Sequence, residues 1–162
     1  MHINILKTKQ ANKLSLFISQ NEDYLIEDSL IDKLKNTFAI ICVEEKLSEC
    51  SVNLKILNDH EMKDLNHRFR DKDSSTNVLS FTNEDISKEM TGNIGDIAIN
   101  YEYVQRESKE FNKSFDNHMI HMLIHGIYHI LGFDHKNDET ADIMENKEIT
   151  LLEKLNINNP YK

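Results

Sequence analysis

Three histidines in one short stretch constrain this chain more than any other feature. The stretch runs from His125 to His135 and reads HGIYHILGFDH. His125 and His129 are four residues apart, so on an α-helix they project from one face, one turn apart. His135 reaches the same point only if the helix ends and the chain turns, and Gly132 permits a left-handed helix end. The stretch therefore predicts a long helix that stops near Gly132 and three imidazoles that converge on one ion.

The type of ligand predicts the chemistry of this site. Three nitrogen ligands leave a fourth coordination position open, which is the arrangement of a catalytic zinc rather than of a closed structural one. We therefore expect one Zn²⁺ per chain, although nickel, iron and copper also accept imidazole ligands. A zinc held in this way lowers the pKa of its bound water to about 7 and polarises an oxygen of the substrate. The expected reaction is a hydrolysis.

Further polar residues lie close to the three histidines in the sequence. His121 is one helical turn before His125, near enough to compete as a ligand. His118 is two turns before His125, about 10 Å away, and cannot share its ion. We interpret this pair as partners of the ligands or as substrate contacts, and we place Asp134, next to His135, in the same group.

The residue after His125 separates two kinds of hydrolase. The spacing HxxxHxxGxxH is that of the metzincin peptidases, which carry a general-base glutamate at the position of Gly126. Glycine neither accepts a proton nor orients water, so a peptidase would need a displaced carboxylate such as Asp134 or Asp96. A phosphodiester substrate fits better, because a metal and a positive side chain together stabilise the charge on the transferring phosphorus. Arg70 is the candidate for that side chain.

The charge of the chain limits how it meets a polyanion. Its formal net charge is −9 over 162 residues, which argues against non-specific binding to nucleic acid, since such binding depends on neutralising phosphates. The densest positive charge in the middle of the chain comes from Arg68, Arg70 and Lys72. Mixed charge runs are usually solvated loops, but this one supplies the local basic groups that a polyanionic substrate requires, and Lys72 is a second candidate contact.

Neither a membrane segment nor a cysteine framework is indicated. No segment approaches the roughly 20 apolar residues of a membrane span, and the N-terminus has no apolar run of the signal-peptide type. We therefore expect a cytoplasmic protein. Cys42 and Cys50 are eight residues apart and match no CxxC pattern, so we expect them to be reduced packing residues.

Alternating strand and helix patterns predict the fold class. Strand patterns cover residues 3–6, 51–57, 78–81 and 93–99. Helical patterns cover residues 23–42, a segment capped by Asn58 or Asp59, residues 101–110 and 114–131, and a last helix from 138. The inward apolar positions expected in the second and last of these helices are Met62, Leu65, Phe69, Ile143, Ile149, Leu152 and Leu155. Roughly three or four strands and about five helices predict one α/β or α+β domain over residues 1–162, with the metal site at the end of the long helix.

In these motifs the chain resembles the YbeY endoribonucleases of bacteria and organelles. The family pattern HGxxHLxGYDH is matched from His125 to His135, with Ile130 for the usual leucine and Phe133 for the usual tyrosine. A second match runs from Leu65 through Arg70 to Phe81, and it departs from the family at Ser75 and Thr82, where prolines are common. Other residues that fit the family are Gly95, Asp96, His118, His121 and the Asn-Pro-Tyr ending at Tyr161.

The resemblance implies a zinc-dependent, single-strand-specific endoribonuclease. It implies a role in ribosomal RNA maturation, at the ends of the small-subunit rRNA, and in ribosome quality control, with RNA and the ribosome or ribosomal proteins as partners. By position, His125, His129 and His135 would be the zinc ligands and Arg70 the catalytic or RNA-binding arginine. The implied fold is a small mixed sheet with helices around it and the metal in a cleft.

Three alternatives stay open at the level of sequence. A metalloprotease-like hydrolase would use a displaced carboxylate, and a ribosome-associated binding protein would keep its metal without catalysis. For the ribonuclease, water and the ribose 2′-hydroxyl are both candidates for the attacking group.

Overall fold

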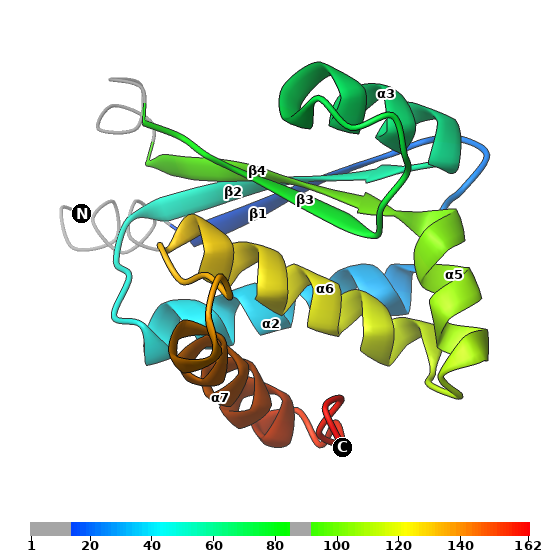
Figure 1. Ribbon diagram of the computed structural model, residues 1–162. Coiled ribbons are helices and arrows are strands. Elements are labelled where there is room, and N and C mark those ends of the chain that lie inside the picture. The colour runs from blue at the N-terminus through cyan, green and yellow to red at the C-terminus, as the bar shows by residue number, and fades with distance from the viewer. Residues whose placement is uncertain (1–13, 85–91) are drawn as a thin grey trace, which may run out of the picture.

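The computed structural model describes residues 14–84 and 92–162, and within these ranges the chain forms four strands and five helices (Figure 1). In chain order they are β1 (Leu14–Gln20), α2 (Asp28–Glu44), β2 (Cys50–Leu57), α3 (Asp59–Arg70), β3 (Val78–Thr82), β4 (Asn93–Asn100), α5 (Tyr101–Glu110), α6 (Phe115–Ile130) and α7 (Asp138–Lys154). The predicted α/β class is confirmed.

The four strands form one mixed sheet in the order β1-β2-β4-β3. β1 pairs with β2 and β2 with β4 in parallel, whereas β3 runs antiparallel to β4. Within residues 14–84 and 92–162, β3 therefore pairs with a strand on one side only. α3 lies over one face of the sheet, and α2 and α6 cover the other (Figure 1). Most of the core lies under that second face, and a smaller cluster of Leu57, Met62 and Ala98 lies on the α3 side.

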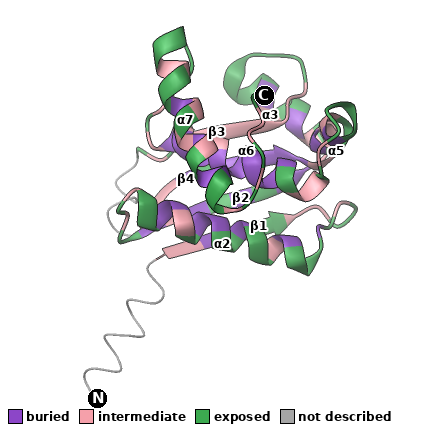
Figure 2. Ribbon diagram, turned by 90° about the horizontal axis from the view of Figure 1, so that it is seen from below, coloured by how far each residue is buried: buried purple, intermediate pink, exposed green. Residues whose placement is uncertain are grey.

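α6 is the central helix and carries two of the three histidines. The side chain of Ser114 caps its first turn by accepting a hydrogen bond from the Asn117 backbone at 3.0 Å. Figure 2 shows that α6 is buried along most of its length, and it contacts both β3 and β4. It ends at Ile130, and Gly132 follows with a φ of 99°. That left-handed backbone turns the chain back, as the position of Gly132 predicted.

The prediction for the N-terminal part of the chain is wrong in two respects. It omits β1, an edge strand whose Leu16 is buried while Phe17 is 59% exposed. The predicted helix from residue 23 begins only at Asp28, so Tyr24 and Leu25 precede it. A short edge strand paired on one side produces a weak alternation that the following helical pattern obscures. The strand predicted at residues 3–6 lies outside the described residues.

Two helix faces also differ from the prediction. Phe69 of α3 is 56% exposed and Ile143 of α7 is 49% exposed, although both were expected to point inward. The buried stripe of α7 consists of the predicted Leu152 together with Met144, Glu148 and Leu151, which were not predicted. The apolar pattern therefore predicts Leu152 correctly and Leu155 packs against the core, but the pattern misses the buried carboxylate of Glu148.

The remaining expectations concern the cysteines and the membrane. Cys42 and Cys50 are free and buried, with their Sγ atoms 3.7 Å apart, which confirms that they are packing residues. Among the helices of residues 14–84 and 92–162, none combines the length and the apolar character that a membrane span requires.

Candidate metal centre and cleft

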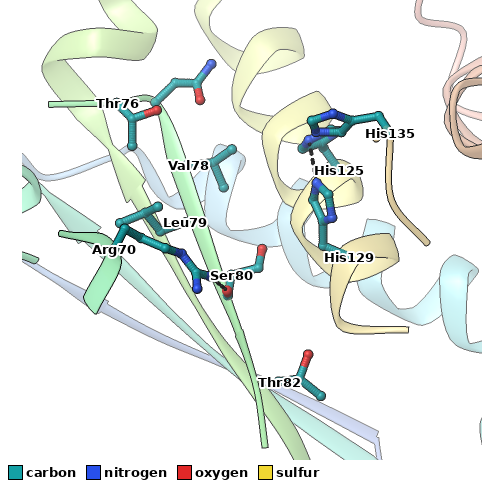
Figure 3. A pocket seen from close by; sticks show the side chains of 10 residues that line it. Arg70, Thr76, Val78, Leu79, Ser80, Thr82, His125, His129 and His135 are labelled. Atoms are coloured by element: carbon teal, nitrogen blue, oxygen red, sulfur yellow. Dashed lines mark hydrogen bonds between the residues drawn. The ribbon is translucent and has the colours of Figure 1, made fainter. Parts of the chain in front are cut away.

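The three histidines converge as their spacing predicts. His125 and His129 come from the last turns of α6, and His135 comes from the loop that follows (Figure 3). The Nε2 atoms of His125 and His129 are 3.1 Å apart, and one nitrogen from each of the three rings lies within 4.8 Å of the others. His135 is exposed, while the other two are partly buried. The three nitrogens therefore form a cluster that is open on one side.

This cluster fits a transition-metal ion. Zinc–nitrogen bonds of about 2.0–2.1 Å at tetrahedral angles place two ligand nitrogens about 3.4 Å apart, close to the separation of the His125 and His129 Nε2 atoms. Burial lowers the pKa of His129, and the nearby His125 and His135 lower it further. Neutral imidazole is the form that binds a metal, so this shift favours ligation. The three histidines can hold a metal ion and leave a position for substrate.

A cleft joins the histidines to Arg70. Its volume is about 510 Å³, and its lining consists of Arg70, Thr76, Asn77, Val78, Leu79, Ser80, Thr82, His125, His129 and His135. None of these described lining residues is acidic. Arg70 is the last residue of α3, which lies on one face of the sheet, whereas α6, which carries two of the histidines, lies on the other. Because β3 is an edge strand, groups from both faces reach one cleft.

Two contacts hold the Arg70 side chain along β3. Its Nη2 atom donates a hydrogen bond to the Ser80 carbonyl at 2.8 Å. Its guanidinium carbon lies 5.1 Å from the centre of the Phe81 ring, at the distance of a cation–π contact. The predicted proximity of a positive side chain to the metal site is thus present in the geometry (Figure 3).

Gly126 has a packing role that the sequence did not indicate. Its carbonyl accepts a hydrogen bond from Ser80 Oγ at 3.1 Å. A Cβ at this position would lie 3.0 Å from Ser80 Oγ and 3.1 Å from two side-chain carbons of Ile97. Position 126 therefore faces the sheet, where glycine lets α6 approach β3 and β4 closely. A glutamate here would enter the packed interface instead of reaching the metal as a base.

Replacing Gly126 with glutamate should consequently destabilise the fold without creating a peptidase. Overpacking costs about 1–3 kcal/mol and a buried unpaired charge adds several more, so we expect the free energy of unfolding to fall by about 3 kcal/mol or more. Urea denaturation measures this loss. Gly126→Ala is the matched control and should lose less, because higher helix propensity returns about 1 kcal/mol. A stable Gly126→Glu protein that cleaves casein would contradict the packing argument.

Three predicted polar residues that do not belong to α6 lie outside the cleft lining. Lys72 is exposed beyond the end of α3. Asp134 accepts a hydrogen bond from the Lys136 backbone at 3.2 Å, and that bond lowers its pKa. Asp96 bonds Asn53 at 2.9 Å and pairs in register with Phe81, whereas the neighbouring Ser80 faces α6. Successive side chains of a strand alternate between faces, so Asp96 points away from the histidines.

His118 and His121 lie deeper in α6. Both are more than nine-tenths buried, and they line a separate cavity beside the C-terminal residues. Nε2 of His118 lies 3.2 Å from Glu107, and burial lowers the pKa of His118 despite this contact. Nε2 of His121 lies 2.9 Å from Glu148. His121 is therefore bound to a carboxylate and does not join the three-histidine cluster.

Glu148 is the site residue that the sequence reading missed. It is fully buried on α7, and its Oε1 lies 3.1 Å from Nδ1 of His125 as well as 2.9 Å from His121. Burial alone would raise the pKa of Glu148, but the hydrogen bonds from His121 and His125 outweigh it and hold the pKa at about 2. Its spacing of four from both Met144 and Leu152, on one helix face, is the signal that would have drawn attention to it.

The fold and the cleft together define an α/β protein in which an open cluster of three histidines, able to hold a metal ion, lies beside an arginine. Residues 16–156 match the family model described as Endoribonuclease YbeY. The chain therefore belongs to the YbeY family, as the resemblance predicted.

Individual relatives agree with this assignment. Endoribonuclease YbeY of Francisella philomiragia is 38% identical over 93% of this chain and 96% of its own length. Endoribonuclease YbeY of Ruthia magnifica is 41% identical over 85% of this chain and 96% of its own. The solution structure of TM1509 from Thermotoga maritima superposes with a TM-score of 0.59 and 25% identity, covering 91% of this chain and 96% of that one.

Proposed function

We propose that this chain is a zinc-dependent, single-strand-specific endoribonuclease that acts in ribosomal RNA maturation and ribosome quality control. The small-subunit rRNA ends are its expected substrate, and ribosomal proteins are its expected partners. Membership of an endoribonuclease family supports the activity. The observation that carries the proposal is the cleft, in which Arg70 and the three histidines share one lining that contains no acidic side chain among the described residues.

The cleft carries a local positive charge although the chain as a whole is negative. A net charge of −9 repels a polyanion at long range. Among the residues that line the cleft, the side chain with a permanent charge is Arg70, and a bound metal cation would increase the positive charge there. Arginine also matches the geometry of a phosphate with two parallel donors. The cleft therefore offers a phosphodiester a positive group on an otherwise acidic protein.

In the proposed mechanism, the histidines on one wall of the cleft and Arg70 on the other have different roles. His125, His129 and His135 would hold the zinc, which supplies Lewis-acid polarisation of a phosphoryl oxygen and activation of the attacking group. Arg70 would donate hydrogen bonds to a non-bridging oxygen and stabilise the charge that develops there. Its bond to the Ser80 carbonyl already orders the guanidinium. Thr76 and Thr82 also line the cleft, and their hydroxyls would contact the ribose and bases.

The rival hydrolase has less support from the geometry. A metalloprotease lacking glutamate at Gly126 needs another carboxylate at the metal, and neither Asp134 nor Asp96 lines the cleft. The non-catalytic binding protein remains distinct from both enzymes, because it predicts that chelation changes stability while RNA stays intact. We also infer that residues 1–162 form a single domain and that the protein acts in the cytoplasm.

Incubation of zinc-loaded protein with a single-stranded RNA, a duplex of the same sequence and casein tests the proposal. We expect one metal equivalent per chain, cleavage of the single strand, little cleavage of the duplex and none of casein. A chelator should abolish cleavage, and added zinc should restore it. Product ends identify the attacking group, since a cyclic phosphate requires the 2′-hydroxyl. Cleavage of casein alone would favour the protease, and absence of any cleavage would favour the binding protein.

A further inference from the structure

Glu148 is a fully buried carboxylate that the proposed reaction does not use directly. It belongs to α7, and besides His121 and His125 it contacts the hydroxyl of Tyr161, which lies 3.2 Å from its Oε1 and 3.1 Å from its Oε2. A buried charge is costly unless hydrogen bonds compensate for it. Two donors from α6 and one from the C-terminal tail supply that compensation. Such an arrangement fixes the positions of all four side chains.

The carboxylate determines which nitrogen of His125 is free. An ionised carboxylate only accepts hydrogen bonds, so Nδ1 of His125 carries the proton that bonds Glu148. In the neutral ring, which is the form that binds a metal, Nε2 is then the bare nitrogen, and it faces Nε2 of His129 at 3.1 Å. His129 in turn bonds the backbone of Phe133. Both rings are anchored on one side and present a bare nitrogen to the same point on the other.

Tyr161 anchors Glu148 from the C-terminal tail. The tail turns back after α7, where the Ile157 backbone donates to the Leu152 carbonyl at 2.9 Å. The Tyr161 ring meets the His121 ring edge-on, with centroids 5.6 Å apart. Burial beside Glu148 raises the pKa of Tyr161, so its hydroxyl keeps its proton and donates it to the carboxylate. The tail thereby restricts rotation of the carboxylate that orients His125.

We propose that Glu148 is a positioning residue of the metal site and that Tyr161 holds it in place, so that the C-terminal tail raises metal affinity without touching the metal. The inference rests on the metal-binding part of the proposed function. Carboxylates that hold the second nitrogen of a metal-binding histidine fix its ring and tautomer, and their loss typically weakens metal binding by about 10–100-fold. Glutamine at position 148 loses the negative charge that strengthens the bonds to both histidines, and it replaces one of the two oxygens that accept from Tyr161 with a donor.

The test compares zinc affinity among Glu148→Gln, Tyr161→Phe and the double variant, with Glu153→Gln as a control on the exposed face of α7. Competition with a chromophoric chelator gives the affinity, and the melting temperature of the metal-free proteins reports on the fold. We expect Glu148→Gln to bind zinc about 10–100-fold more weakly and Tyr161→Phe about 2–10-fold more weakly. Glu153→Gln should match the wild type.

The double variant separates positioning from general packing. If Tyr161 acts through Glu148, removing its hydroxyl should cost nothing further once Glu148 is glutamine. Wild-type zinc affinity in Glu148→Gln, or fully additive losses in the double variant, would overturn the proposal. Should Glu148→Gln fail to fold, Tyr161→Phe decides, and wild-type affinity in that variant counts against it. No RNA enters these measurements, so wild-type protein that binds zinc but leaves RNA intact would contradict only the proposed nuclease activity.

Discussion

Replacing His129 with alanine is expected to abolish zinc binding and RNA cleavage together. The Nε2 atoms of His129 and His125 are 3.1 Å apart, so the variant removes one of the nitrogens that meet at the ion. Loss of an outer partner of a ligand already weakens binding by about 10–100-fold, and loss of the ligand itself should exceed that. Metal analysis after dialysis measures the first effect. Cleavage of single-stranded RNA, expected to fall to the level of a protein-free sample, measures the second.

His60→Ala is the matched control for this experiment. His60 lies on α3 with a side chain that is 84% exposed, and it contacts only the exposed Asp64 among the described ion pairs. The same substitution there should leave zinc content and cleavage at wild-type values. If His129→Ala retained both, the three-histidine cluster would not be the metal site. If it lost zinc but still cleaved RNA, the reaction would not depend on this metal.

Replacing Arg70 with alanine should separate catalysis from metal binding. Arg70 lines the same cleft as the histidines but belongs to the opposite wall, where it bonds the Ser80 carbonyl. Zinc content should therefore be unchanged. Removing one donor from a developing oxyanion typically lowers the rate by about 10²–10³-fold, and we expect kcat/KM for RNA cleavage to fall by that order. Steady-state kinetics on one fluorescent RNA would measure it.

Two further variants sharpen the Arg70 prediction. Arg68→Ala removes the same charge from the same helix at an exposed position outside the cleft lining, so it should cleave RNA at nearly the wild-type rate. Arg70→Lys keeps the charge but loses the planar pair of donors, and an intermediate rate is expected. Equal losses in Arg68→Ala and Arg70→Ala would mean that overall charge matters rather than the cleft arginine. Cleavage by Arg70→Ala at the wild-type rate would remove Arg70 from the mechanism.

Much of the fold followed from local patterns. The strand alternation at 51–57 and the cap at Asn58 correspond closely to β2 and the start of α3, and α5 occupies the predicted residues Tyr101–Glu110. Local periodicity and caps are properties of a few neighbouring residues, so sequence shows them directly. The prediction missed β1 because, among the described strands, this edge strand pairs only with β2, which lies about 30 residues further along the chain. Part of the buried face of α7 was missed because it includes Glu148, a charge that no apolar pattern selects.

The site likewise has one part that local sequence predicts and another that depends on tertiary contacts. The sequence by itself determined the convergence of His125, His129 and His135, because a spacing of four is one helical turn and Gly132 permits the return. Only the tertiary structure decided what surrounds them. An antiparallel edge strand brings Arg70 to the histidines, close packing on Ser80 and Ile97 requires Gly126, and α7 delivers Glu148 to His125. These contacts join residues distant in the chain, and their geometry depends on how sheet and helices pack rather than on local spacing.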